Sequence, residues 1–351
     1  MSSAPTAVPG RPVLPLSLQV LAVAALTVII GVAVAVAIAP AAWAVDIERN
    51  LRAADALRAG SFGTVEGYLY TPLAAALTLP LTFVPVGVAV AGWLAARLAL
   101  ILAGVRRETA GRPIGDRAAA ALAAVTFVPT LHDLMLGNVS VVMTAALAPV
   151  LWWRDRCWTG IALGLVLATF PKPQLIPILV WMLVFRRRSL LGALGTAAIA
   201  TGVGVLWLGF ERYLTFVDVV LHVPYLETPM YGNLGLTGLT PDLVVPLGML
   251  TVAAAAIGLW RGEVAGFICA VGAGILLAPY TMAYSAVPLL LGVRPLSRVA
   301  PRTTFALALT GSLGVLVFLP LWVGAVMAVA LGVPRLRWAR AEREPATIRA
   351  P

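Results

Sequence analysis

The sequence predicts an all-α protein that crosses a membrane many times. Of its 351 residues, 61% are hydrophobic and 11% are charged, whereas soluble domains carry about 25% charged residues. Apolar stretches of about 20 residues, the length of a helix that spans a bilayer, recur from end to end. A β-barrel would instead show short alternating segments. We therefore expect a bundle of about twelve transmembrane helices, folded as one domain over residues 14–334.

The distribution of basic residues gives the orientation of this bundle. The net charge is +10, and the arginines cluster in short gaps between apolar runs. This positive-inside pattern places the gaps in the cytoplasm, beside anionic lipid heads, and argues against nucleic-acid binding. We expect a disordered cytoplasmic N-terminus (1–13) and a basic cytoplasmic tail (335–351). The clusters are Arg106–Arg107, Arg154 with Arg156, Arg186–Arg188, Arg294, Arg298 and Arg302.

The first predicted span, residues 16–39, leads into a polar outer segment over residues 40–71. Its apolar run is longer than the roughly 7–15 residues of a signal-peptide core, so we expect it to stay uncleaved. In the outer segment, apolar residues at helical spacing predict an amphipathic helix on the outer membrane surface, ended by glycines. These residues are Ile47, Leu51, Ala54 and Leu57, followed by Gly60 and Gly63.

The remaining spans alternate with short polar turns. Residues 72–85 are apolar but short, so we expect a re-entrant piece or one packed beneath the surface helix. A second outer loop is expected over residues 210–242. Residues 303–333 form either one long span or two short ones broken near Pro320, and the basic tail favours two. The other expected spans are 86–105, 117–131 and 138–153 with an outer turn at 131–138, 158–170, 174–185, 190–209, a span ending at Arg261, and a hairpin that turns at 278–285.

Groups that can transfer protons gather on the predicted outer face. Most carboxylates and both histidines, His132 and His222, fall in outer segments, while the spans are almost free of charge apart from Arg97. A transporter more often buries ionisable groups near the midplane, in two related halves. Hydrolase, metalloprotease and phosphate-loop motifs are missing from the sequence. What remains is chemistry that uses a carboxylate base and energy stored in a lipid-linked substrate.

Lys172 is the only lysine among the 25 basic residues. It stands between Pro171 and Pro173 in a predicted outer turn between two spans. Proline stiffens such a turn, which would hold the ammonium at the depth of the lipid headgroups. Lys172 is therefore a candidate for binding a lipid phosphate. The alternative is an anchor that contacts any phospholipid head.

Several outer-face motifs follow one another along the chain. They are Asp46 after the first span, Tyr70-Thr71-Pro72, Gly137-Asn138-Val139-Ser140, Lys172-Pro173, Gly232-Asn233, and Pro279-Tyr280 with Tyr284. This order resembles glycosyltransferase family 87, the polyprenyl-phosphate-mannose-dependent α-mannosyltransferases of the GT-C class. The resemblance covers residues 16–295. The sequence departs from the family pattern in two places: glutamine is missing after Gly137, and Thr71 replaces a proline.

The resemblance implies a GT-C-like bundle that transfers a sugar, expected to be mannose, from polyprenyl phosphate to a glycolipid or polysaccharide hydroxyl. The transfer is expected on the extracytoplasmic face of a bacterial plasma membrane. An inverting transfer needs a base for the hydroxyl proton and a cation for the departing phosphate. Asp46 is the implied base, and its ordinary alternative is a helix cap. No cofactor or metal site is expected. The donor candidates are Lys172, Arg49, His132, Asp133 and Asn138, and the candidates for acceptor or loop contacts are His222, Tyr225, Asn233 and Tyr70.

Two other classes of function stay open. A transporter of lipid-linked saccharides would move its cargo through the membrane without forming a bond. A non-catalytic subunit of an envelope-assembly complex would tolerate the departure after Gly137. The presence of both Asp46 and Lys172 in one chain favours the enzyme.

Overall fold

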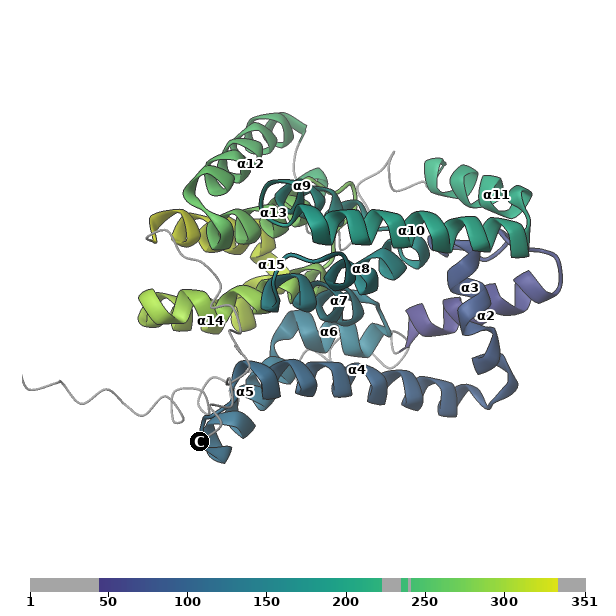
Figure 1. The fold of residues 1–351 in the computed structure, drawn as a ribbon, viewed down its shortest axis with the longest axis horizontal. Helices are drawn as coiled ribbons and strands as arrows, with labels where there is room; N and C mark the ends of the chain where they lie inside the picture. Colours follow the sequence, from purple (N-terminus) through teal and green to yellow (C-terminus); the bar gives the residue numbers. More distant parts are fainter. Residues whose placement is uncertain (1–43, 223–234, 239–240, 334–351) are drawn as a thin grey trace, which may run out of the picture.

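The computed structural model describes residues 44–222, 235–238 and 241–333, and every regular element in these ranges is a helix (Figure 1). The all-α prediction is therefore confirmed for this part of the chain. Several predicted features lie outside the described residues: the first span at 16–39, the N-terminus, the basic tail, Tyr225 and Asn233.

Three described helices are long and apolar enough to cross a membrane: α4 (Val86–Glu108), α10 (Arg187–Leu208) and α12 (Pro241–Arg261). A fourth crossing is possible if α5 (Ile114–Thr126) and α6 (Val128–Leu136), which meet at 61°, form one broken span. The other apolar helical segments, such as Leu319–Gly332, are shorter, so a total of about twelve spans stays a prediction.

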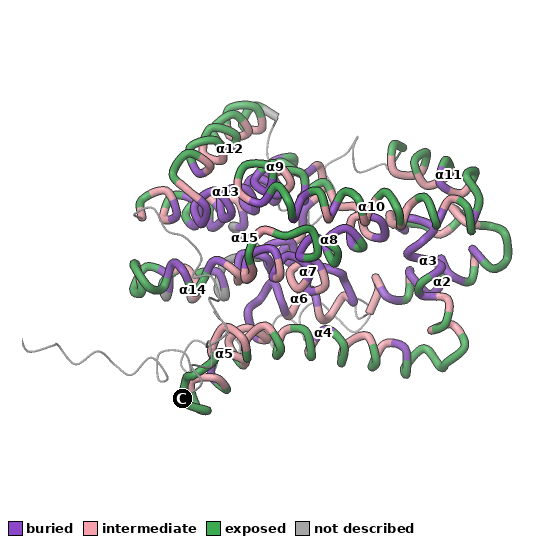
Figure 2. Tube along the Cα trace, viewed as in Figure 1, coloured by how far each residue is buried: buried purple, intermediate pink, exposed green. Residues whose placement is uncertain are grey.

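Large apolar side chains on the long helices point outward. Val88 of α4 is 58% exposed, Leu206 of α10 is 89% exposed and Trp260 of α12 is 71% exposed. Figure 2 shows these helices largely exposed around a buried centre. Such an apolar exterior suits contact with lipid rather than with water.

The buried centre consists of shorter helices. They are α7 (Ser140–Trp152), α8 (Cys157–Thr169), α9 (Ile176–Phe185) and α13 (Glu263–Leu277). Almost every residue of α13 is buried, so this helix is enclosed on all sides. A buried ion pair between Arg186 and Glu263 joins the end of α9 to the start of α13. Trp181 strengthens this junction by donating its indole N–H to the Glu263 carbonyl at 2.9 Å.

Small residues bring α8 and α10 into close contact. A Cβ built on Gly160 would lie 1.9 Å from the Ser189 carbonyl oxygen, so only glycine fits there. Ser189 is held in turn by Asp155, whose carboxylate accepts from its backbone N–H and its hydroxyl at 2.8 Å. Glycine lets helix backbones approach closely in membranes. Helix α8, which precedes the turn with Lys172, is thereby packed against the long apolar helix α10.

Helices α2 (Val45–Arg58), α3 (Pro72–Thr78) and α11 (Phe210–Leu221) lie at the end of the bundle opposite α14 (Leu290–Val299), which carries Arg294 and Arg298 (Figure 1). The 3₁₀ turn η2 (Leu79–Phe83) follows α3 directly. Helix α2 lies where the amphipathic helix was predicted. Its apolar face, however, is buried against the protein, with Ile47 1% exposed and Ala54 fully buried. A contact between this face and the membrane surface is therefore not seen.

The predicted outer loop at 210–242 begins with a helix, which the sequence analysis missed. Helix α11 carries apolar residues at helical spacing, and they are exposed: Phe210, Leu214, Val217 and Leu221. Their i, i+4, i+7 and i+11 spacing is the sequence signal for this helix. The predicted turn at 131–138 is also largely helical, because Pro129 sits in the first turn of α6 and only Gly137 ends the helix.

Near the C-terminal end, residues 301–332 are helical throughout, as α15 (Pro301–Gly332), after the 3₁₀ turn η6 (Ala283–Leu289) and α14 (Leu290–Val299). The Trp322 indole nevertheless donates to the Leu307 carbonyl at 2.8 Å. In a straight helix, 15 residues span about 22 Å. Helix α15 therefore bends back on itself between these residues, which favours two arms over one straight span.

Candidate active site

The start of α2 is pressed against the end of α6. Ala44 has a positive φ of 61° and donates its backbone N–H to the Met135 carbonyl at 2.7 Å. Gly137 ends α6 with φ at 78°, and a Cβ there would lie 2.9 Å from the side chain of Ile47. These two turns place Asp46, in the first turn of α2, beside the turn between α6 and α7. The Asp46 side chain is 16% exposed.

Asn138 connects Asp46 to Lys172. Its side-chain Nδ2 donates to Asp46 Oδ2 at 2.6 Å, and its Oδ1 accepts from Lys172 Nζ at 2.8 Å. The same Oδ1 accepts from the Val139 backbone N–H at 2.8 Å and the Ser140 hydroxyl at 3.2 Å. Since an ammonium only donates and a carboxylate only accepts, these partners fix the orientation of the amide. Asn138 is 2% exposed, so the bridge is shielded from solvent.

Arg49 and the helix itself add positive charge at Asp46. Arg49 Nη1 lies 3.3 Å from Asp46 Oδ1, one turn along α2. The first turn of a helix also favours a negative charge. Asp46 does not act as the helix cap, because Ala44 holds that position and no side chain caps α2. Its two oxygens face Asn138 and Arg49 instead.

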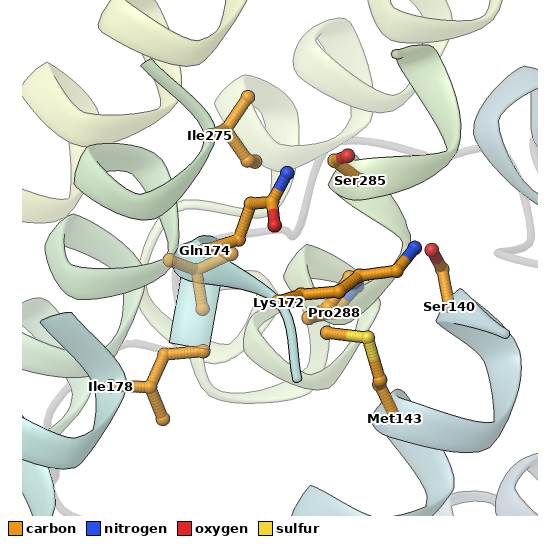
Figure 3. Close-up of a pocket in the computed structure, with 9 residues that line it drawn as sticks. Ser140, Met143, Lys172, Gln174, Ile178, Ile275, Ser285 and Pro288 are labelled. Carbon is orange, nitrogen blue, oxygen red and sulfur yellow. The ribbon is translucent and has the colours of Figure 1, made fainter. Parts of the chain in front are cut away.

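Lys172 enters the site from the turn between α8 and the 3₁₀ turn η3 (Pro173–Leu175). Its Nζ lies over the Tyr284 ring, 4.9 Å from the ring centre. A cation in this position is attracted to the face of the aromatic ring. Burial lowers the pKa of Lys172 to about 8, although the negative charges of Asp46 and Asp133 act in the opposite direction. In Figure 3, the Lys172 ammonium points toward Ser140.

A small cavity of about 10 Å³ lies under Lys172 (Figure 3). Polar groups of Ser140, Gln174 and Ser285 share its lining with apolar side chains. A cavity of this size holds about one water molecule, so a sugar ring does not fit inside it. The apolar lining residues are Met143, Ile178, Val271, Ile275 and Pro288.

Asp133 and His132 occupy neighbouring positions in α6, the helix that precedes the Asn138 turn. Asp133 is fully buried; its Oδ1 accepts from the Ser140 backbone N–H at 2.8 Å, and its Oδ2 lies 3.3 Å from Arg97 Nη1. The His132 ring packs against Tyr284, with 5.4 Å between ring centres. Donor contacts of His132 and Asp133 stay predictions.

Tyr70 lies next to the cluster formed by Asp46, Asn138 and Lys172, whereas His222 does not. The Tyr70 ring packs edge-on against Phe170, in the Lys172 turn, at 5.0 Å between centres. Burial and then the nearby Asp46 charge raise the pKa of Tyr70 well above its ordinary value. His222 is 76% exposed and pairs with Asp218 at the end of α11. A contact between the described end of α11 and the cluster is therefore not seen.

The structure adds Arg97, Ser140 and Tyr284 to the candidate site. Tyr284 was visible in the late Pro–Tyr motif, and Arg97 stood out as a charge inside an apolar run. An ionisable residue within a span marks a functional site by default, together with a partner, and that signal was available for Arg97. Among the described residues, no three His, Cys, Asp or Glu side chains gather as metal ligands.

The fold and the site define a helical membrane protein that holds a carboxylate, an amide and an ammonium in a row at one end of its bundle. The model of glycosyltransferase family 87 matches residues 68–320, so the chain belongs to this family and is a membrane glycosyltransferase. The predicted family is thus confirmed. Neither the comparison with characterised proteins nor that with solved structures finds a match.

The matched range has a bearing on the site. It contains Asn138, Lys172 and Tyr284, but Asp46 and Arg49 precede it. The association of α2 with this site therefore comes from the tertiary structure and not from the family match.

Proposed function

We propose that this glycosyltransferase moves a sugar from a polyprenyl phosphate to an acceptor hydroxyl, with Asp46 as general base and Lys172 as ligand of the donor phosphate. One observation carries the proposal: Asn138 holds the Asp46 carboxylate at 2.6 Å and the Lys172 ammonium at 2.8 Å, on opposite ends of one amide. A base and a cation are the two groups that this transfer needs.

The chemistry follows from these two groups. Asp46 takes the proton of the acceptor hydroxyl while the oxygen of that hydroxyl forms a bond to the anomeric carbon of the donor sugar. The bond from that carbon to the phosphate oxygen breaks, and the electron pair leaves with the phosphate. Lys172 stabilises the negative charge that develops on the phosphate. Electrostatic stabilisation of this kind is usually the largest single contribution to catalysis. With the base beside the acceptor hydroxyl and the cation beside the departing phosphate, attack and departure take place on opposite faces of the sugar, and the anomeric configuration inverts.

The position of the site supports a lipid-linked donor. Helix α2, whose first turn holds Asp46, lies at the end of the bundle opposite α14 and the C-terminal end of α4 (Figure 1), and these two carry Arg294 and Arg107. By the positive-inside pattern this end is extracytoplasmic. A phosphate carried by a membrane lipid lies at headgroup depth, next to such a turn. The donor sugar is proposed to be mannose from the resemblance, and the acceptor a glycolipid or polysaccharide of a bacterial envelope.

The test uses purified enzyme in lipid vesicles with a radiolabelled sugar on polyprenyl phosphate. Asp46→Asn removes the base, and general-base catalysis contributes about 10²–10⁴-fold, so transfer should fall by at least about 100-fold. Glu48→Gln, two residues along α2 with an exposed side chain, is the matched control and should keep wild-type transfer.

The outcomes separate the open functions. Full transfer by Asp46→Asn would remove Asp46 as the base. Movement of the lipid-linked sugar across the vesicle membrane without bond formation, unaffected by Asp46→Asn, would favour a transporter. Absence of transfer from every polyprenyl-linked sugar would count against the donor class.

A further inference from the structure

Arg97 lies inside α4, one of the long apolar helices, and is only 2% exposed. A charge in such a place is costly unless it is fully paired. The guanidinium makes its contacts outside α4 with a single segment, residues 133–138. It donates to the carbonyls of Asp133 at 2.6 Å, Leu134 at 3.1 Å and Asn138 at 3.4 Å, and lies 3.3 Å from Asp133 Oδ2.

Trp93 contacts the same segment from one helical turn earlier. Its indole Nε1 donates to the Gly137 carbonyl at 2.8 Å, and the Arg97 guanidinium lies 5.5 Å from its ring centre. Residues four apart lie on one helix face, so Trp93 and Arg97 together draw the carbonyl groups of the turn toward α4.

Asp133 fastens the turn from its other side. Its carbonyl oxygen accepts from the backbone N–H of Gly137 and of Asn138, both at 3.1 Å, and its Oδ1 accepts from the Ser140 N–H. The backbone of Asn138 is thus held at both its N–H and its carbonyl. The Asn138 side chain is left to contact Asp46 and Lys172.

We propose that Arg97 is a positioning residue for sugar transfer: with Trp93 and Asp133 it fixes the backbone of Asn138, so that the amide holds Asp46 and Lys172 in their reactive arrangement. This inference rests on the proposed function. A buried ion pair alone is weak evidence for a stabilising role. A planar fork that donates to three carbonyls of one turn has the geometry of a support for that turn.

The first test removes both buried charges together, because a single loss would leave an unpaired charge that destabilises the fold. In Arg97→Met with Asp133→Asn, the new amide oxygen still accepts from the Ser140 N–H. The enzyme in lipid vesicles should show a kcat at least about tenfold lower, with the fold checked by its unfolding temperature. An unchanged kcat in this folded double variant would overturn the inference.

A double-mutant cycle distinguishes positioning of Asn138 from general support of the fold, because the effects of substituting two residues are non-additive when one acts through the other. On the Asn138→Ala background, Arg97→Met with Asp133→Asn should lower kcat by less than about twofold. Additive losses would show that Arg97 does not act through Asn138 and would overturn the inference. Additive losses together with an inactive Asp46→Asn would leave the proposed function standing.

Two gentler variants protect the test against misfolding. Trp93→Phe removes one donation to the turn and should lower kcat severalfold, again with little effect on the Asn138→Ala background. Arg97→Lys keeps the charge but not the fork, and its kcat should stay below wild type. Full kcat in Arg97→Lys would show that charge alone suffices, and equal losses from Trp93→Phe on both backgrounds would contradict positioning through Asn138.

Discussion

Asn138 Nδ2 lies 2.6 Å from Asp46 Oδ2, although 92 positions separate the two residues in the chain. The contact joins the first turn of α2 to the turn between α6 and α7. Its other end, Asn138 Oδ1, receives the Lys172 ammonium. One amide therefore contacts both the carboxylate and the ammonium of the site.

Asn138→Asp replaces the amide with a second carboxylate next to Asp46. Two carboxylates that share a site repel each other, so one of them keeps a proton to a higher pH. We expect lower transfer at neutral pH and an acidic limb of the pH–rate profile shifted upward by about one unit or more. The measurement is kcat/KM for the donor against pH. Asn138→Ala, which adds no charge, should lose activity without this shift.

Lys172→Met removes the ammonium but keeps an unbranched apolar stem beside Tyr284. If Lys172 binds the donor phosphate, the donor KM should rise at least about tenfold, since hydrogen bonds to charged groups contribute about 1.5–3 kcal/mol. Lys172→Arg keeps a cation in reach and should retain more of the donor affinity. Initial rates over a range of donor concentrations give both constants. Unchanged donor kinetics in Lys172→Met would leave the lysine only as a membrane anchor.

The pKa of Lys172, lowered to about 8 by burial, predicts a basic limit to activity. The ammonium binds phosphate only when protonated, so kcat/KM for the donor should fall as the pH rises through about 8. Bound phosphate favours the charged form, so kcat at saturating donor should fall only at a higher pH. Lys172→Arg should abolish the basic limb. A wild-type profile that stays flat to pH 10 would argue against this role.

Gly137→Ala tests the contact between the two turns. Gly137 has φ at 78°, and a Cβ there would meet Ile47 at 2.9 Å, which would push α2 and Asp46 away from Asn138. Transfer should therefore fall at least about tenfold, by the logic of a misplaced catalytic group. Gly111→Ala is the matched control, because Gly111 has φ at 81° but open space around its Cβ position. Both variants share the backbone strain, so wild-type-like transfer in both would contradict the geometry.

Much of the local structure was predictable from the sequence. The apolar runs gave the helices α4, α10 and α12, and glycines end α2 near residue 60 as the spacing implied. The proline-flanked turn set Lys172 apart, whereas the cytoplasmic side that the arginine clusters indicate stays a prediction. These features depend on neighbours within one or two helical turns, so periodicity and turn residues reveal them.

Contacts between residues that are distant in the chain could not be predicted from the sequence. The apolar stripe of α2 predicted a side that faces the outer membrane surface, whereas α3 and the Gly137 turn cover it in the structure. Asp133 was predicted to lie in an outer turn. In the structure it belongs to α6 and is fully buried beside Arg97. The bend of α15 at the Trp322–Leu307 contact had no signal beyond Pro320.

The sequence by itself determined a helical membrane protein and the residue types able to act as base and cation, and it predicted an orientation from the arginine clusters. Only the tertiary structure decided that Asp46 and Lys172 meet across Asn138, and that Arg97 holds the turn behind them. The physical reason is that a side chain's spacing determines which face of its helix it occupies. Which distant helix that face meets depends on how all the apolar surfaces are buried together.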